Sequence, residues 1–130
     1  MTKQEKAKDA RLRKLFRITL AEWKKIKEFQ ESHPVYARLL GERLGTDHRH
    51  KDGKLRGCLE WRLNRAYGLI EKAFPNNTAA VLEALALYHS KHPAELALGK
   101  KVYGLIGQAK VKRRMRYGDE STDADKGAAQ

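Results

Sequence analysis

The sequence DHRHKDGKLRGCLEWRLN, residues 47–64, decides the fold of this chain. Its Asp52-Gly53 pair is typical of a two-residue type I′ hairpin turn, in which both residues have positive φ angles. The residues that flank this pair have the two-residue period of extended chain. We therefore predict one strand over residues 44–49, a second strand over residues 55–59, and a tight turn between them.

The spacing of apolar residues changes from two to three or four at about residue 59, which indicates a change from strand to helix. We expect a helix over residues 59–74 whose apolar stripe consists of Leu59, Leu63, Ala66, Ile70 and Phe74. Along the strand before it, alternation predicts Arg56 and Cys58 on one face and Leu55, Gly57 and Leu59 on the other.

Three polar residues of this strand, turn, strand and helix unit are expected to converge. Asp47 and His48 lie near the end of the first strand, and Asn64 lies in the second turn of the helix. When the helix packs across the hairpin, the carboxylate and the amide offer oxygen ligands to one hard divalent cation. The histidine beside them can take a proton from water. The stretch therefore predicts a metal-assisted hydrolytic site.

The same stretch resembles the signature of the phage recombination endonuclease VII family, within the wider His-Me finger (HNH-like) nucleases. The residues that carry the resemblance are Asp47, His48, His50, Gly53, Arg56, Gly57, Asn64, Ala66 and Gly68. A weaker similarity extends over residues 19–117, and only the central motif is specific. The resemblance implies an α+β fold, mostly α, in which a ββα-metal hairpin-helix motif is flanked by helices.

The resemblance also implies roles for individual residues. Asp47 and Asn64 would ligate Mg²⁺ or Mn²⁺, and His48 would be the general base. His50 would brace the hairpin or take part in catalysis, and the first role is the one we favour. Arg56 would clamp a phosphate, although an exposed strand residue with no such role is nearly as good an interpretation. The family further suggests branched, Holliday junction-like DNA as the substrate and a homodimer as the assembled state.

The chain departs from the family at the structural zinc site. Family members carry two Cys-x-x-Cys pairs, and the second pair falls where this chain has Glu60 and Leu63. Cys58 is the single cysteine, and one cysteine cannot build such a site. We expect no structural zinc, and we expect a small apolar core around Tyr36, Leu39 and Leu40 in its place.

Composition narrows the class of partner. The 130 residues suit one domain, and 28 Lys and Arg against 16 Asp and Glu give a formal net charge of +12. Nucleic acid, with DNA as the form that the resemblance implies, is the first candidate partner and an anionic membrane surface the second. No run reaches the ~18 apolar residues of a spanning helix, and no apolar signal region follows the basic N-terminus. We expect a cytoplasmic protein with no membrane partner. It would be either encoded by a phage and active in the host cytoplasm, or encoded by a bacterium.

Four segments are expected along the chain. A basic arm covers residues 1–17 and the nuclease domain residues 18–99, followed by a basic arm at 100–117 and a disordered acidic tail at 118–130. Within the domain, a capping box of Thr19 and Glu22 starts a helix that ends before Pro34. Further helices are expected from about residue 78 and over residues 93–98.

The basic residues near the motif and in the second arm are candidate DNA contacts. They are Arg49, Arg62, Arg65, Lys100, Lys101, Lys110, Lys112, Arg113, Arg114 and Arg116. The sequence thus favours a metal-dependent endonuclease. Two alternatives stay open: a non-catalytic nucleic-acid-binding module that keeps the hairpin as a scaffold, and a basic regulator that binds an acidic protein surface.

Overall fold

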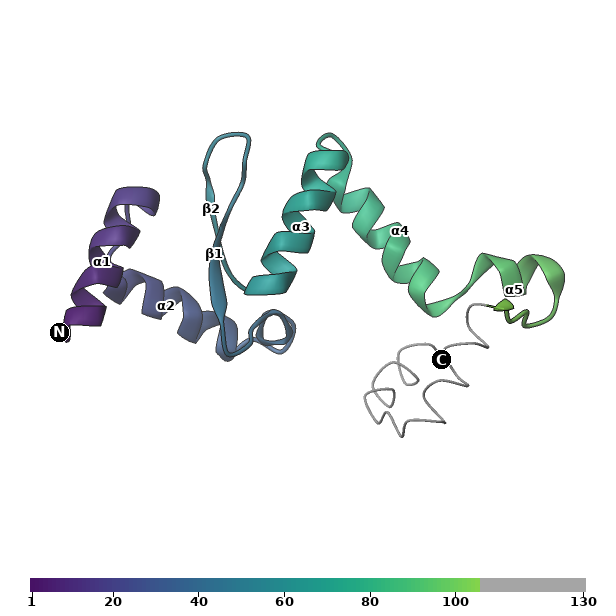
Figure 1. The fold of residues 1–130 in the computed structure, drawn as a ribbon, viewed down its shortest axis with the longest axis horizontal. Coiled ribbons are helices and arrows are strands. Elements are labelled where there is room, and N and C mark those ends of the chain that lie inside the picture. The colour runs from purple at the N-terminus through teal and green to yellow at the C-terminus, as the bar shows by residue number, and fades with distance from the viewer. Residues whose placement is uncertain (106–130) are drawn as a thin grey trace. The chain divides into compact units, whose positions relative to one another are not determined.

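The computed structural model describes residues 1–105 of the chain. It divides into two compact units, Met1–Ala73 and a second unit that begins at Phe74 (Figure 1). The division falls earlier than the domain boundary we expected after residue 99. The described part is mixed α and β, mostly helical, with one two-stranded antiparallel sheet. The expected fold class is confirmed at this level.

The sheet is the predicted hairpin of β1 (Leu44–His48) and β2 (Leu55–Glu60). Pairing runs in register from Leu44 opposite Glu60 to Asp47 opposite Gly57, and then His48 lies opposite Leu55. The shift leaves Arg56 as an extra residue on β2, which is a β-bulge. The prediction that Arg56 and Cys58 share a face is therefore wrong, because the bulge interrupts the alternation between them.

The loop between the strands is longer than a two-residue turn. The Arg49 amide donates to the Lys54 carbonyl, and the Gly53 amide donates to the Arg49 carbonyl, each over 2.7 Å. Gly53 has a φ of 76°, but Asp52 is not among the described residues with positive φ, so the predicted type I′ turn is wrong. The Asp52 carboxylate instead accepts hydrogen bonds from the Lys54 amide (3.1 Å) and the Arg49 guanidinium (2.9 Å).

Two capped helices precede the hairpin. Helix α1 (Lys3–Phe16) begins with a capping box of Thr2 and Glu5, and α2 (Leu20–Glu31) begins with the predicted box of Thr19 and Glu22. The segment we expected to be a basic arm, partly helical or disordered, is largely helical. Leu12 of α1 is only 4% exposed, which makes this helix part of the folded unit.

The core of the first unit lies between these helices and the hairpin. Leu12, Leu20, Trp23 and Cys58 form its buried cluster, and the partly buried Leu40 packs against it. Trp23 is 7% exposed, and its indole N–H donates to Thr46 Oγ1 over 3.1 Å, as expected of a packing residue. The short 3-10 helix η1 (Tyr36–Leu39) precedes Leu40. Of the three residues expected to form a core in place of the zinc, only Leu40 packs against this cluster, while Leu39 is partly buried and Tyr36 is exposed.

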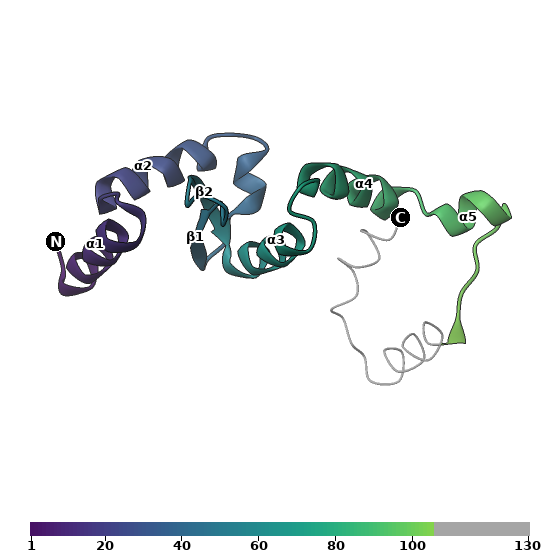
Figure 2. The same ribbon diagram turned by 90° about the horizontal axis from the view of Figure 1, so that it is seen from above.

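Helix α3 (Trp61–Ala73) lies on the other side of the hairpin from α1 and α2 (Figure 2). The Glu60 carboxylate starts the helix by accepting hydrogen bonds from the amides of Arg62 (3.1 Å) and Leu63 (3.0 Å). Leu63, part of the predicted apolar stripe, is 38% exposed. The face of α3 that meets the hairpin is instead polar, and it carries the candidate site.

The second unit contains α4 (Thr78–Ser90) and α5 (Pro93–Leu98). Pro93 occupies the first turn of α5, and Gly99 ends it in the left-handed region at a φ of 69°, as the sequence predicts. Neither helix has a buried residue. Among the residues that the structure describes, no helix combines the length and the apolar character needed to cross a membrane.

Candidate functional site

Asp47 is the buried acid of the hairpin. It lies next to the end of β1 and is 7% exposed. Its carboxylate accepts hydrogen bonds from Arg56 of β2, with 2.8 Å between Oδ2 and Nε and 3.2 Å between Oδ1 and Nη2. Both carboxylate oxygens are therefore in contact with a positive charge.

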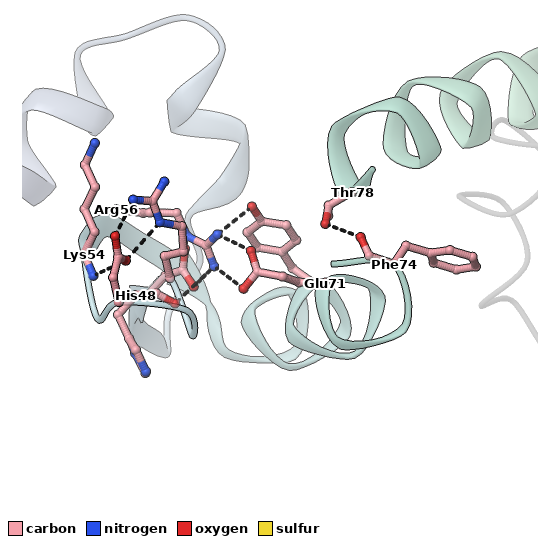
Figure 3. Close-up of polar contacts among 10 residues, drawn as sticks. His48, Lys54, Arg56, Glu71, Phe74 and Thr78 are labelled. Atoms are coloured by element: carbon pink, nitrogen blue, oxygen red, sulfur yellow. Dashed lines mark hydrogen bonds and ion pairs between the residues drawn. The ribbon is translucent and has the colours of Figure 1, made fainter. Parts of the chain in front are cut away.

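Arg56 lies between the hairpin and α3, where Figure 3 shows its contacts with Glu71. Nη1 donates to the Tyr67 hydroxyl (2.9 Å) and to Glu71 Oε2, while Nη2 donates to Glu71 Oε1 (3.2 Å) and the His48 carbonyl (3.1 Å). The guanidinium carbon also lies 4.5 Å from the centre of the Tyr67 ring. The bulge thus directs Arg56 to a polar cluster that joins β1, β2 and α3.

The charges of this cluster stabilise one another. Burial alone would lower the pKa of the Arg56 guanidinium, but its hydrogen bonds to Glu71 and Asp47 more than offset burial, and the pKa is raised. The hydrogen bond from Arg56 holds the pKa of the Glu71 carboxyl below its ordinary value. Arg56 and Glu71 are therefore both charged at neutral pH. As a phosphate clamp, Arg56 would first have to leave partners that occupy all of its nitrogens.

The two histidines of the motif contact different helices, His48 near α1 and His50 near α3. The His48 ring lies 5.7 Å from the ring of Phe16 in α1 and 5.3 Å from the His50 ring, measured between centroids. A Cβ atom added to Gly68 of α3 would lie 3.6 Å from His50 Cε1, so the His50 ring lies against α3. This position suits the interpretation of His50 as a brace between hairpin and helix.

Asn64 lies on the same side of β1 as Asp47. A Cβ atom added to Gly45 would lie 2.6 Å from Asn64 Nδ2, so the amide occupies the space beside this glycine. Gly45 and Asp47 are two residues apart on the strand and hence point to the same face. The structure thus brings both predicted ligands to one face of the hairpin, at different positions along it.

Asp47 and Asn64 line two different cavities. Asp47, Arg56 and Tyr67 line one of about 480 Å³, which extends to η1. Asn64 lines another of about 500 Å³ together with Lys8 and Arg11 of α1. The convergence that we predicted for Asp47 and Asn64 is therefore limited to a shared strand face.

The donor chemistry of Asp47 and Asn64 suits a hard divalent cation, since Mg²⁺ commonly takes one or two protein oxygens and keeps several waters. Within residues 1–105 there is no group of three or more His, Cys, Asp or Glu side chains placed to hold a metal ion. A divalent cation would therefore have to bind to Asp47 and the amide oxygen of Asn64, and Arg56 would have to break its hydrogen bonds to Asp47.

Glu60, which the family resemblance aligns with a zinc cysteine, and Cys58, the single cysteine, both have other contacts in this structure. Glu60 caps α3 and pairs with Arg62, with 2.8 Å between Nε and Oε1. Cys58 is 1% exposed, and burial raises the pKa of its thiol. A buried thiol with a raised pKa is a poor nucleophile and metal ligand at neutral pH.

The candidate DNA contacts fall into three groups. Arg49 and Arg62 are ion-paired with Asp52 and Glu60, and the Arg62 side chain is 76% exposed. Arg65, Lys100 and Lys101 are exposed. The rest lie outside the described residues: Lys110, Lys112, Arg113, Arg114 and Arg116.

The sequence interpretation missed Tyr67 and Glu71, which hold Arg56. A signal for them was present, because Asn64, Tyr67 and Glu71 are spaced three and four apart and so share one helical face. Lys8 and Arg11, which the sequence places only in a basic arm, line the cavity beside Asn64. They line this cavity because α1 packs against the hairpin through Leu12.

Comparison with protein-family models, with curated proteins and with solved structures finds no match to this chain.

Proposed function

We propose that the chain is a divalent-metal-dependent endonuclease that hydrolyses phosphodiester bonds in DNA, with a ββα-metal unit like that of the endonuclease VII family it resembles. One observation carries the proposal. Asp47 and His48 are neighbours on β1, and Asn64 of α3 occupies the space beside Gly45 on the Asp47 face. The carboxylate and the amide thereby share the face of β1 that meets α3, and the imidazole belongs to the next residue along the strand, where it lies near Phe16 of α1.

In the proposed mechanism, neutral His48 takes the proton of a water molecule as its oxygen attacks the phosphorus. Asp47 and Asn64 are the groups that would hold Mg²⁺ or Mn²⁺. A cation bound there would supply positive charge for the phosphate and the departing 3′ oxygen. His50 keeps the hairpin against α3 and so positions His48.

The net charge of +12 supports a polyanionic substrate. Family resemblance suggests branched DNA and a homodimer, and both are part of the proposal. A cleavage panel of branched, single-stranded and duplex DNA tests the first. Light scattering tests the second, for which the exposed Leu82, Leu85 and Leu87 of α4 offer apolar surface.

Nicking of supercoiled plasmid by the purified protein tests the function directly. We expect nicking with Mg²⁺ or Mn²⁺, none with EDTA, and no stoichiometric zinc by elemental analysis. Asp47→Ala and Asn64→Ala should require more metal ion or lose activity. If both variants keep the wild-type Mg²⁺ response, Asp47 and Asn64 are not the metal ligands. If elemental analysis finds one zinc per chain, the expected absence of a structural zinc is wrong.

A second candidate is a non-catalytic nucleic-acid-binding module. The position of Arg56 favours it, because a guanidinium on both oxygens of Asp47 opposes cation binding. Such a module would bind DNA in a salt-sensitive way but would not nick plasmid at any metal concentration.

A further inference from the structure

Arg56 is shared between two carboxylates that approach it from different elements. Asp47 of β1 contacts Nε and Nη2. Glu71 of α3 contacts Nη1 and Nη2 (Figure 3). The side chains are 22% exposed for Arg56, 9% for Asp47 and 15% for Glu71. With all three groups ionised, the cluster has one negative charge more than it has positive charge.

The two contacts are not equivalent. Both carboxylates contact the guanidinium through two oxygens, but Glu71 contacts its two terminal nitrogens, whereas Asp47 contacts Nε and one terminal nitrogen. Tyr67 and the His48 carbonyl also accept from the terminal nitrogens. If Arg56 released Asp47, its two terminal nitrogens would keep these partners, and Nε would have to find water. If Arg56 released Glu71 instead, the carboxylate of Glu71 would be left half-buried without its main partner.

We propose that Arg56 is a displaceable cap on Asp47, and that Glu71, assisted by Tyr67, is the positioning residue that retains Arg56 when a divalent cation takes its place. The inference rests on the proposed function, because it assumes that Asp47 is a cation ligand. The excess negative charge supplies the attraction for the cation. Arg56 supplies the competition, since it neutralises Asp47 until the cation arrives.

Mn²⁺ binding measured by titration calorimetry, without DNA, tests the proposal apart from catalysis. Arg56→Gln removes the cap and should tighten Mn²⁺ binding on the order of tenfold or more, because a nearby positive charge is lost. Glu71→Gln removes the alternative partner, so that Arg56 stays on Asp47, and should weaken binding by roughly ten- to a hundredfold. Tyr67→Phe should weaken it by a smaller factor.

The double variant separates positioning from simple charge. If Glu71 acts through Arg56, Glu71→Gln should have little further effect in the Arg56→Gln background. If Glu71 merely adds negative charge, its effect should be as large there as in the wild type. Arg49→Gln is the matched control, because it removes a carboxylate-paired arginine from the same hairpin, and it should change Mn²⁺ affinity far less than Arg56→Gln.

Circular dichroism melts accompany each variant, and where Arg56→Gln does not fold, Glu71→Gln and Tyr67→Phe decide the outcome. The proposal is overturned if the variants leave Mn²⁺ affinity unchanged, if Arg56→Gln weakens it, or if Glu71→Gln keeps its full effect in the double variant. Failure of the proposed function looks different, because the wild type would then nick no DNA with any divalent cation. If the wild type nicks DNA but the Mn²⁺ affinities of the variants do not follow the predicted order, only the proposal that Arg56 caps Asp47 is contradicted.

Discussion

The two faces of the hairpin are stabilised by different interactions, apolar burial on one and hydrogen bonds between charged groups on the other. On the side of α1 and α2, Cys58 enters an apolar cluster with Leu12, Leu20 and Trp23, and burial of apolar surface stabilises the contact. On the side of α3, Arg56 joins Asp47 to Glu71 through charge-assisted hydrogen bonds. One face is therefore tolerant of pH and ions, whereas the other is sensitive to both. The cation site that we propose lies on the second face.

The largest expected effect comes from breaking the polar face. Arg56→Ala leaves Asp47 and Glu71 without their shared partner and should lower the free energy of unfolding by about 3 kcal/mol, near the low end for a broken buried ion pair. Urea denaturation measures it. Arg62→Ala removes an arginine whose side chain is 76% exposed, and should cost under about 1 kcal/mol. Equal losses in the two variants would mean that the Arg56 cluster is not buried as described.

The apolar face is tested by Leu12→Ala. Removing a side chain that is 4% exposed should cost about 2.5 kcal/mol through lost burial and a residual cavity. Leu15 on the same helix is 55% exposed, and Leu15→Ala should change stability by under about 0.5 kcal/mol. If the two variants melt alike, α1 is the detached arm that its composition suggested.

Substitution of Gly57, the residue that follows the bulge at Arg56, tests how closely Gln30 approaches β2. Gly57 has a φ of 154°, and a Cβ atom there would lie 2.8 Å from Gln30 Oε1. Gln30 spans the buried backbone of Cys58, accepting from its N–H (2.7 Å) and donating to its carbonyl (2.9 Å). Gly57→Ala should therefore cost about 2 kcal/mol, from backbone strain and disturbance of Gln30.

Gly53→Ala is the control for this substitution. Gly53 has a φ of 76°, but a Cβ atom there meets nothing within 4 Å, so only backbone strain remains, about 1 kcal/mol. Thermal melts of the two variants measure the difference. A larger loss for Gly53→Ala would show that the close approach of Gln30 to Gly57 is not a feature of the folded protein.

The smallest expected effect is the dependence of stability on pH. The hydrogen bond from Arg56 lowers the pKa of Glu71 in the folded state. A lowered pKa gives stability that is complete above the unfolded value, ~4.3, and is lost as the pH falls through the folded value. The wild type should therefore lose more stability than Glu71→Gln between pH 6 and pH 3. Parallel pH profiles would show that Glu71 does not contribute through its charge.

The sequence predicts most of the local structure of the first unit. Thr19 and Glu22 predict where α2 begins, Pro34 predicts where it ends, and the change of period predicts α3. These signals act over a few residues, so tertiary contacts do not alter them. The turn is different, because the Asp52 carboxylate bonds to Arg49 and Lys54 and favours a longer loop than the Asp-Gly pair alone.

The candidate site was less predictable. Arg56 turns to Asp47 and Glu71 only because β2 carries an extra residue, and alternation along the sequence has no signal for such a bulge. Leu12 becomes a core residue only because α1 folds back on Trp23, in a segment too basic to suggest a core. Both features depend on contacts between elements, which a local pattern does not contain.

The most direct test of the central claim is the nicking rate of His48→Ala. The substitution should lower the single-turnover rate by ~10²- to 10⁴-fold, as loss of a general base does, while the affinity for DNA stays close to that of the wild type. His89→Ala, a change at an exposed histidine of α4, should leave both unchanged. Wild-type nicking by the His48→Ala protein would contradict the proposed mechanism.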